Sequence, residues 1–136
     1  MICELCVTSG ENELWHGENC RVILVDDVDY PGFCRVVWNE HIKEMSDLSM
    51  QMRVELMNTV FAVESAVREV MQPEKINLAS LGNVTPHLHW HVIPRYLDDK
   101  HFPNPIWAPP VRNTRVSNVV DVRLRLMASI KKQLTA

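Results

Sequence analysis

Three histidines alternate with apolar residues in one short segment of this 136-residue chain, at His87, His89 and His91. Successive side chains of an extended strand point to opposite faces, so we expect the three imidazoles on one face and the intervening apolar side chains in the core. Imidazoles at this spacing repel one another when protonated and are poor packing material. The pattern therefore favours a reactive or ligand-binding face over its alternative, a solvated polar strand face.

One chemistry open to such a face is nucleophilic catalysis, in which an imidazole nitrogen attacks an electrophile such as phosphorus. A neutral imidazole nitrogen is a good nucleophile near pH 7, because the reference pKa of histidine is about 6.5. The middle ring, His89, is the natural attacker, since its neighbours can fix its tautomer and place charge beside phosphate oxygens. A metal site built from all three rings is a further option, but no nearby carboxylate pattern supports it.

The segment from His87 to Ile93, followed by Pro94 and Arg95, resembles the signature of the histidine triad (HIT) superfamily, His-φ-His-φ-His-φ-φ with φ apolar. The resemblance implies a nucleotide hydrolase or transferase that cuts a phosphoanhydride or phosphoramidate at the α-phosphate, similar to the diadenosine polyphosphate hydrolase-like bacterial HIT proteins. It implies that His89 forms a covalent nucleotidyl-histidine and that His91 stabilises charge beside the phosphate and the leaving group. His87 is implied as the third catalytic residue, which supports His89. It also implies a purine nucleotide substrate and a homodimer.

Three functions remain open for such a site. Hydrolysis of a nucleoside phosphoramidate or a dinucleoside polyphosphate releases the nucleoside monophosphate to water. Nucleotidyl transfer shares the covalent half-reaction and delivers the nucleotide to another acceptor. A nucleotide-binding, zinc-stabilised module without turnover belongs to a different class, and the intact triad disfavours it because binding alone needs no nucleophile.

Polar residues just before the triad are candidates for binding phosphate. Asn83 lies four residues before His87, where many HIT relatives carry a phosphate-contacting glutamine, and its amide can donate to a phosphate oxygen. Thr85 is a second candidate for the same role. The alternative for Asn83 is a turn residue after Gly82.

Two aspartates are candidates for binding the ribose. Asp26 and Asp27 follow a predicted strand and precede a Pro-Gly turn, a place similar to the one where HIT relatives hold the ribose hydroxyls. A carboxylate can accept hydrogen bonds from both hydroxyls of a diol, and we favour Asp26 for this role. The alternative is that both aspartates are ordinary turn residues.

Cys3 and Cys6 have the spacing of a metal-binding pair. In zinc-containing branches of the HIT superfamily, the resemblance implies that His41 and His87 complete the ligand set. Two thiolates and two imidazoles make a closed tetrahedral site, so a zinc ion held there is structural and not catalytic. Free thiols and a redox-active cysteine pair are the alternatives.

Composition limits the class of protein. The formal net charge of −3 excludes a general basic field and argues against binding to long nucleic acid. No run approaches the roughly 18 apolar residues of a membrane span, and the beginning of the chain lacks the features of a signal peptide. We therefore expect a cytoplasmic protein without membrane contact, with residues 1–136 forming a single HIT domain.

Periodicity predicts the elements that position the site. Apolar alternation predicts strands at 14–16, 21–25, 33–38, 76–81 and about 87–95, and helical periodicity predicts one long helix that starts at an N-cap on Ser46 and ends before Pro73. A second helix is expected from about 118 to 134. The fold class is therefore α+β, a HIT-like fold with a mainly antiparallel sheet, one long helix packed on it and a C-terminal helix. The proline-rich segment 97–110 is expected to be a lid, a dimer arm or a packed connector.

Overall fold

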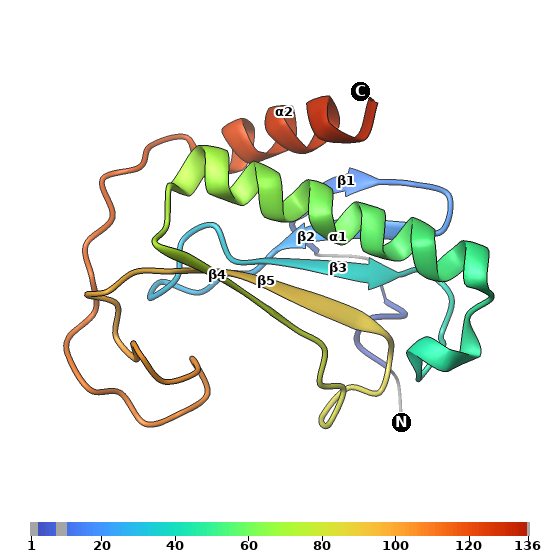
Figure 1. Cartoon of the computed structure of the whole chain (residues 1–136), viewed down its shortest axis with the longest axis horizontal. Coiled ribbons are helices and arrows are strands. Elements are labelled where there is room, and N and C mark those ends of the chain that lie inside the picture. The colour runs from blue at the N-terminus through green and yellow to red at the C-terminus, as the bar shows by residue number, and fades with distance from the viewer. Residues whose placement is uncertain (1–2, 8–10, 136) are drawn as a thin grey trace.

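The computed structural model describes residues 3–7 and 11–135. It contains a five-stranded antiparallel sheet and two α-helices (Figure 1). The sheet has the strand order β1-β2-β3-β5-β4, so the two strands that are last in sequence pair with each other and β5 lies between β3 and β4. The bounds of the strands are Glu13–His16 for β1, Cys20–Leu24 for β2, Cys34–Trp38 for β3, Lys75–Ala79 for β4 and His89–Arg95 for β5. The helices are α1, Met50–Met71, and α2, Val122–Thr135. The α+β class and the antiparallel sheet are as the sequence predicts.

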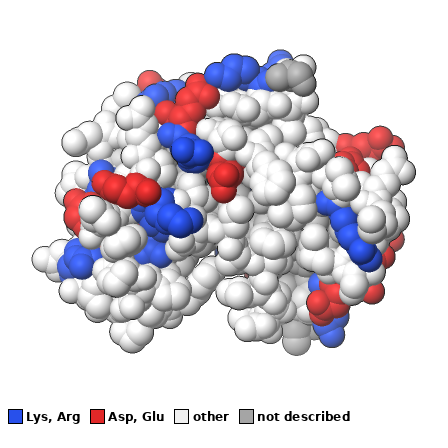
Figure 2. All heavy atoms as spheres, in the orientation of Figure 1, with Lys and Arg blue, Asp and Glu red and all other residues white. Residues whose placement is uncertain are grey.

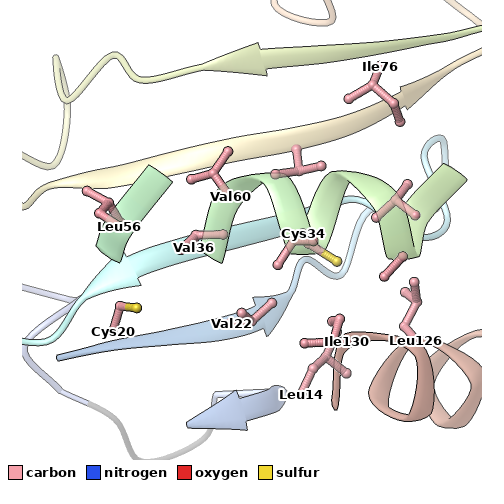
Figure 3. Close-up of a cluster of buried hydrophobic side chains, with 14 of the residues drawn as sticks. Leu14, Cys20, Val22, Cys34, Val36, Leu56, Val60, Ile76, Leu126 and Ile130 are labelled. Atoms are coloured by element: carbon pink, nitrogen blue, oxygen red, sulfur yellow. The ribbon is translucent and has the colours of Figure 1, made fainter. Parts of the chain in front are cut away.

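Both helices contribute to the main hydrophobic core on one face of the sheet. Leu56 and Val60 of α1 lie over Val22 and Val36 of the central strands, and Ile130 of α2 fills the space beside β1 (Figure 3). All five side chains are fully buried, and burial of one such aliphatic side chain stabilises the folded state by about 1.5–3 kcal/mol. The apolar partners of the triad pack into the same core, namely Leu88, Trp90 and Val92.

Because side chains alternate between the two faces of a strand, the triad histidines project from the face of the sheet opposite the helices. In the β3–β5 pair, Val37 lies opposite His89 and Arg35 lies opposite His91. Residues directly opposite each other in an antiparallel pair project from the same face of the sheet. The face away from the helices therefore carries His89, His91 and Arg35, as the alternation predicts for the histidines. Arg21 of β2 lies opposite Val37 and projects from the same face.

The long helix begins three residues later than expected. Ser46 lies in a short 3-10 helix, η1 (Met45–Asp47), and the N-cap of α1 is Ser49, whose hydroxyl accepts a hydrogen bond from the backbone N–H of Met52. The prediction of Ser46 as the N-cap was wrong because both serines suit a cap, and burial of Leu48 decides between them. The other end agrees with the sequence, since Gln72 adopts a left-handed C-cap conformation directly before Pro73.

Other boundaries also differ from the expectation. Strand β5 starts at His89 and not at about residue 87, so His87 lies just before the strand. The C-terminal helix starts at Val122 and not near residue 118, because Asp121 has a φ of 53° and cannot be part of a right-handed helix. Strand β4 ends at Ala79 instead of residue 81. The next residue, Ser80, turns its hydroxyl to donate to the carbonyl of His89 at 2.7 Å, so that β4 and β5 stay connected beyond the ladder.

The surface carries mixed charge. Lysine, arginine, aspartate and glutamate side chains are interspersed on the face shown in Figure 2, in keeping with the small net charge. Within residues 3–7 and 11–135, neither helix has the length and apolar character needed to cross a lipid bilayer.

Candidate active site and metal-ligand cluster

A cavity of about 390 Å³ lies on the sheet face opposite the helices, and its floor is formed by His89, His91 and Arg35. This volume is in the range of small-molecule binding sites. Three other segments supply the walls: the N-terminal segment, the β4–β5 loop and the proline-rich segment. The wall residues are Glu4, Leu5, Leu81, Gly82, Asn83, Val84, Thr85 and Trp107.

His89 is held in one orientation by the backbone. Its Nδ1 donates to the carbonyl oxygen of His87 at 2.6 Å, which leaves the lone pair on Nε2 for the cavity. Burial lowers the pKa of His89, the nearby charge of Arg35 adds to the effect, and the hydrogen bond to His87 opposes it. A ring with this tautomer and a lowered pKa is neutral near pH 7, as a nitrogen nucleophile has to be.

His91 is the second ring of the cavity. Its centroid lies 4.9 Å from that of His89 in an edge-to-face arrangement, and the Trp107 ring lies 5.2 Å away on the other side. Burial, then the neighbouring His89 and Arg35, lower the pKa of His91 to about 4. The Nδ1 atom of His91 is buried and has no hydrogen-bond partner among the described residues. His91 is thus a neutral ring that can hydrogen-bond to a bound group.

The third triad residue, His87, faces a different set of side chains. Its Nδ1 lies 3.5 Å from Sγ of Cys3, 3.5 Å from Sγ of Cys6 and 3.2 Å from Nδ1 of His41. Sγ of Cys6 lies 3.3 Å from Nδ1 of His41. One ligand atom from each of the four residues lies within 4.8 Å of all the others. The structure therefore brings together Cys3, Cys6, His41 and His87, which we call the thiol–imidazole cluster.

The spacing in this cluster fits a bound metal ion. Zn–S bonds of about 2.3 Å and Zn–N bonds of about 2.0–2.1 Å in a tetrahedron give N···N edges of about 3.3–3.4 Å and N···S edges of about 3.5–3.6 Å. The observed separations of 3.2, 3.3 and 3.5 Å agree with these edges. In addition, Nε2 of His87 lies 2.6 Å from the carbonyl oxygen of Trp38 and donates to it, so Nδ1 carries a lone pair with no proton of its own. The cluster can hold a metal ion.

The candidate phosphate ligands and the candidate ribose ligands lie in different places. Asn83 and Thr85 line the cavity beside His89, and their phosphate role stays a prediction. Asp26 and Asp27 are not among the residues that line it. Asp26 is exposed, whereas Asp27 accepts a hydrogen bond from the backbone N–H of Asp29 at 2.9 Å, which is the geometry of a turn.

Arg35 and Trp107 were missed at the sequence level although both line the cavity. Arg35 had a detectable signal, since it is the one charged residue inside the otherwise apolar strand β3. Trp107 had none, because its approach to His91 depends on the path of the proline-rich segment. That segment is therefore part of the cavity wall.

A buried polar network at the end of β5 fixes the path of this segment. The guanidinium of Arg95 donates to both carboxylate oxygens of Asp99, at 2.8 and 3.1 Å, and both side chains are buried. The hydroxyl of Tyr30 donates to Asp99 at 3.1 Å and lies 2.7 Å from Nδ1 of His101. We call Tyr30, Arg95, Asp99 and His101 the Asp99 network.

The network is electrostatically complete. Burial opposes ionisation of Asp99, but the hydrogen bonds from Arg95 and from the backbone N–H groups of Tyr96, Phe102 and His101 outweigh it and hold the pKa of this carboxyl well below its usual range. Burial and the charge of Asp99 raise the pKa of Tyr30 to about 12. Asp99 is therefore a constant anion that connects the backbone N–H groups of His101 and Phe102, in the proline-rich segment, to Arg95 of β5.

A second cavity of about 390 Å³ adjoins the first. The two cavities share His89, Leu81 and Gly82, and the second extends past η1 to Lys43 and Ser80. His89 therefore lines both cavities.

Comparison with known proteins agrees with this architecture. The family model described as HIT domain matches residues 10–98. A histidine triad protein from Marinobacter aquaeolei VT8 is 27% identical, with a TM-score of 0.71, and the match covers 92% of this chain and 89% of the other. A histidine triad (HIT) protein from Sinorhizobium meliloti 1021 is 24% identical with a TM-score of 0.73, covering 90% and 89%. A Zn-bound histidine triad family protein from Mycobacterium smegmatis is 20% identical with a TM-score of 0.66, covering 93% and 88%. No curated protein matches the sequence.

Proposed function

The chain belongs to the HIT domain family, and from this premise we propose that it hydrolyses a nucleotide at the α-phosphate through a covalent intermediate on His89. The observation that carries the proposal is the bond from His89 Nδ1 to the His87 carbonyl, which leaves the lone pair on Nε2 of a ring that lines a cavity of suitable size. The substrate class is a nucleoside phosphoramidate or a dinucleoside polyphosphate.

The proposed reaction has two steps. Nε2 of His89 attacks the α-phosphorus, the bond from phosphorus to the leaving group breaks, and the leaving group departs with its electron pair and takes up a proton from solvent. Water then attacks the same phosphorus, the P–N bond breaks, and the nucleoside monophosphate leaves. In both steps His91 hydrogen-bonds to the phosphate or the leaving group, and the amide of Asn83 and the hydroxyl of Thr85 donate to phosphate oxygens.

The cavity walls support a nucleotide as the bound molecule. Trp107 is 52% exposed, so its ring has a free surface beside His91 on which a base can stack. The apolar side chains of Leu81 and Val84 lie on the wall formed by the β4–β5 loop. The space on both sides of His89 fits a substrate whose scissile phosphate joins two larger groups. Binding of the ribose by Asp26 stays a prediction, because neither cavity includes this residue.

Turnover by the wild-type protein and by His89→Ala tests the proposal. We expect the wild type to release adenosine monophosphate from adenosine phosphoramidate or diadenosine tetraphosphate, and His89→Ala to lose at least about 1000-fold in kcat. His16→Ala removes an exposed histidine on β1 and should keep full activity. Equal turnover by wild type and His89→Ala would contradict the assignment of the nucleophile.

The reaction products distinguish nucleotidyl transfer from hydrolysis. An added phosphate or alcohol acceptor that captures most of the nucleotide in place of water would identify a transferase. Absence of turnover on both substrates, together with tight binding of adenosine monophosphate, would instead support the non-catalytic binding module.

We also propose that the thiol–imidazole cluster holds a structural zinc ion. Two sulfur and two nitrogen ligands form a closed set, so the ion supplies a fixed positive centre that connects the N-terminal segment to the strand of the triad. Protein purified without added metal should contain about one zinc per chain, and Cys3→Ser with Cys6→Ser should remove it. Metal-free, stably folded wild-type protein would contradict this proposal.

The homodimer is a further proposal. Helix α1 exposes apolar side chains at Val54 and Phe61, which lie two turns apart on the same side of the helix. The strand β4 is at the edge of the sheet. A mass in solution of twice the chain mass is expected from sedimentation or light scattering, and a monomer would contradict it.

A further inference from the structure

The part of the chain that the structure describes contains two buried side-chain nitrogen atoms without a hydrogen-bond partner, Nε of Arg35 and Nδ1 of His91. Both belong to side chains on the floor of the same cavity. An unpaired buried donor costs about 1–3 kcal/mol, and more when it is charged, so such groups are rare in native proteins. Two of them side by side indicate a place where a ligand supplies the missing partners.

The guanidinium of Arg35 makes no ion pair within the described residues. The two fully buried arginines differ from it, since Arg21 pairs with Glu11 and Arg95 pairs with Asp99. Nevertheless Arg35 is half-buried in the middle of β3 and is close enough to lower the pKa values of both His89 and His91. A permanent cation without an anion on the floor of a cavity is suited to bind an anionic group of a ligand.

The register of the sheet places this cation away from the nucleophile. Arg35 lies directly opposite His91, whereas Val37 is the residue opposite His89. Arg35 is therefore the diagonal neighbour of His89, at a Cβ separation of about 7–8 Å in a regular antiparallel pair. His91, with its lowered pKa, contributes no charge of its own near pH 7. Arg35 thus supplies a permanent positive charge directly beside His91 and one residue pair away from His89.

We propose that Arg35 binds a second phosphate group of the substrate, separate from the phosphate that His89 attacks. This inference rests on the proposed function and narrows its substrate class to nucleotides that carry at least two phosphates. The second phosphate comes either from the polyphosphate chain beyond the α-phosphate or from a phosphate on the ribose. A guanidinium binds a phosphate from either source with two parallel hydrogen bonds. The carboxylate of Glu4 on the wall of the same cavity repels further negative charge and so limits how much the cavity accepts.

Calorimetric titration with three nucleotides tests the inference without requiring turnover. Wild-type protein should bind adenosine diphosphate or adenosine 3′,5′-bisphosphate about 10-fold to 100-fold more tightly than adenosine monophosphate. Preference for the diphosphate identifies the polyphosphate chain as the source, and preference for the bisphosphate identifies the ribose phosphate. Arg35→Gln should abolish the preference and leave the affinity for adenosine monophosphate within about threefold of the wild-type value.

Two further variants separate charge from folding. Arg35→Lys keeps the charge but not the paired donors, and should keep part of the preference. Arg125→Gln removes an exposed arginine from α2, on the other side of the sheet, and should change nothing. Thermal unfolding of each variant verifies that it is folded before titration.

Three outcomes would overturn the inference. These are equal wild-type affinity for all three nucleotides, a preference that persists in Arg35→Gln, and an equal loss of affinity for all three in that variant. The last result would place Arg35 on the attacked phosphate or give it a purely structural role. Failure of the proposed function has a different signature, namely lack of turnover while the preference for a second phosphate and its dependence on Arg35 remain.

Discussion

The two ends of β5 are held by contrasting kinds of interaction. At the Arg95 end, the Asp99 network pairs a buried cation with a buried anion and gives each carboxylate oxygen several donors. At the other end, His87 belongs to the thiol–imidazole cluster, where four lone-pair-bearing atoms face one another. The first arrangement satisfies its own hydrogen bonds and charges, whereas the second is a set of atoms that a metal ion can bridge. If the cluster holds zinc as proposed, one anchor of the triad strand is built into the fold and the other depends on the ion.

The comparison predicts that the largest loss of stability follows from disrupting the Asp99 network at the Arg95 end of β5. Asp99→Ala leaves the guanidinium of Arg95 buried without its anion, and we expect the free energy of unfolding to fall by about 3–5 kcal/mol whether or not metal is present. Urea denaturation measures this. The neighbouring Asp98→Ala is the matched control, because Asp98 is 72% exposed in its pair with Arg115 and should cost no more than about 1 kcal/mol. Similar losses in both variants would contradict the contrast.

Removal of metal should lower stability only through the thiol–imidazole cluster. With zinc at 100 to 1,000 times its dissociation constant, a chelator should lower the stability of the wild type by about 3–4 kcal/mol and its Tm by roughly 10 °C. The double variant Cys3→Ser/Cys6→Ser should show no response to the chelator. Cys20→Ala removes a thiol from the core on the helix side and should respond as the wild type does. A chelator response in the double variant would mean that the metal binds elsewhere.

Acid should weaken the middle of β5 before it weakens the Asp99 network. Burial lowers the pKa of His91 to about 4, against 6.5 for an unperturbed histidine, so the unfolded chain binds more protons than the folded chain between these values. The free energy of unfolding therefore decreases as the pH falls from about 6.5 to 4, by up to roughly 1–2 kcal/mol from this residue after screening. Asp99 keeps its charge throughout this range, because its pKa is far lower.

Denaturation at a series of pH values measures this effect. His91→Gln should reduce the dependence between pH 6.5 and 4, since glutamine does not titrate, while stability above pH 7 changes less. Part of the dependence should remain, because burial also lowers the pKa of His87 and His89. A slope that is the same in wild type and variant would show that other groups account for the loss in acid.

Most of what lies on β5 was predictable from the sequence. The alternation of His87, His89 and His91 with apolar residues gives the face of each ring, because the strand period depends only on the backbone. The resemblance to the HIT signature brings His41 and the two N-terminal cysteines to His87, and the structure places their ligand atoms together. These inferences needed either local periodicity or a known pattern.

The remainder depends on contacts between segments that are distant in sequence. Trp107 reaches His91 only because Asp99 ties the proline-rich segment to Arg95, and nothing local in the sequence indicates this pairing. The start of α1 at Ser49 follows from burial of Leu48, which is a tertiary effect. Arg35 was open to prediction as a charge within an apolar strand, but its unpaired state required the coordinates.

The hydrogen bond from His89 Nδ1 to the carbonyl of His87 offers a way to measure metal occupancy by spectroscopy. The residue that supplies this carbonyl also supplies an imidazole to the thiol–imidazole cluster, so a single peptide group joins a coordination centre to a reactive ring. If the cluster binds zinc as proposed, we expect metal binding to change the strength of the hydrogen bond from His89 Nδ1 to this carbonyl. The ¹⁵N resonances of the His89 ring would then serve as a spectroscopic gauge of metal occupancy, readable without substrate and without touching either cysteine.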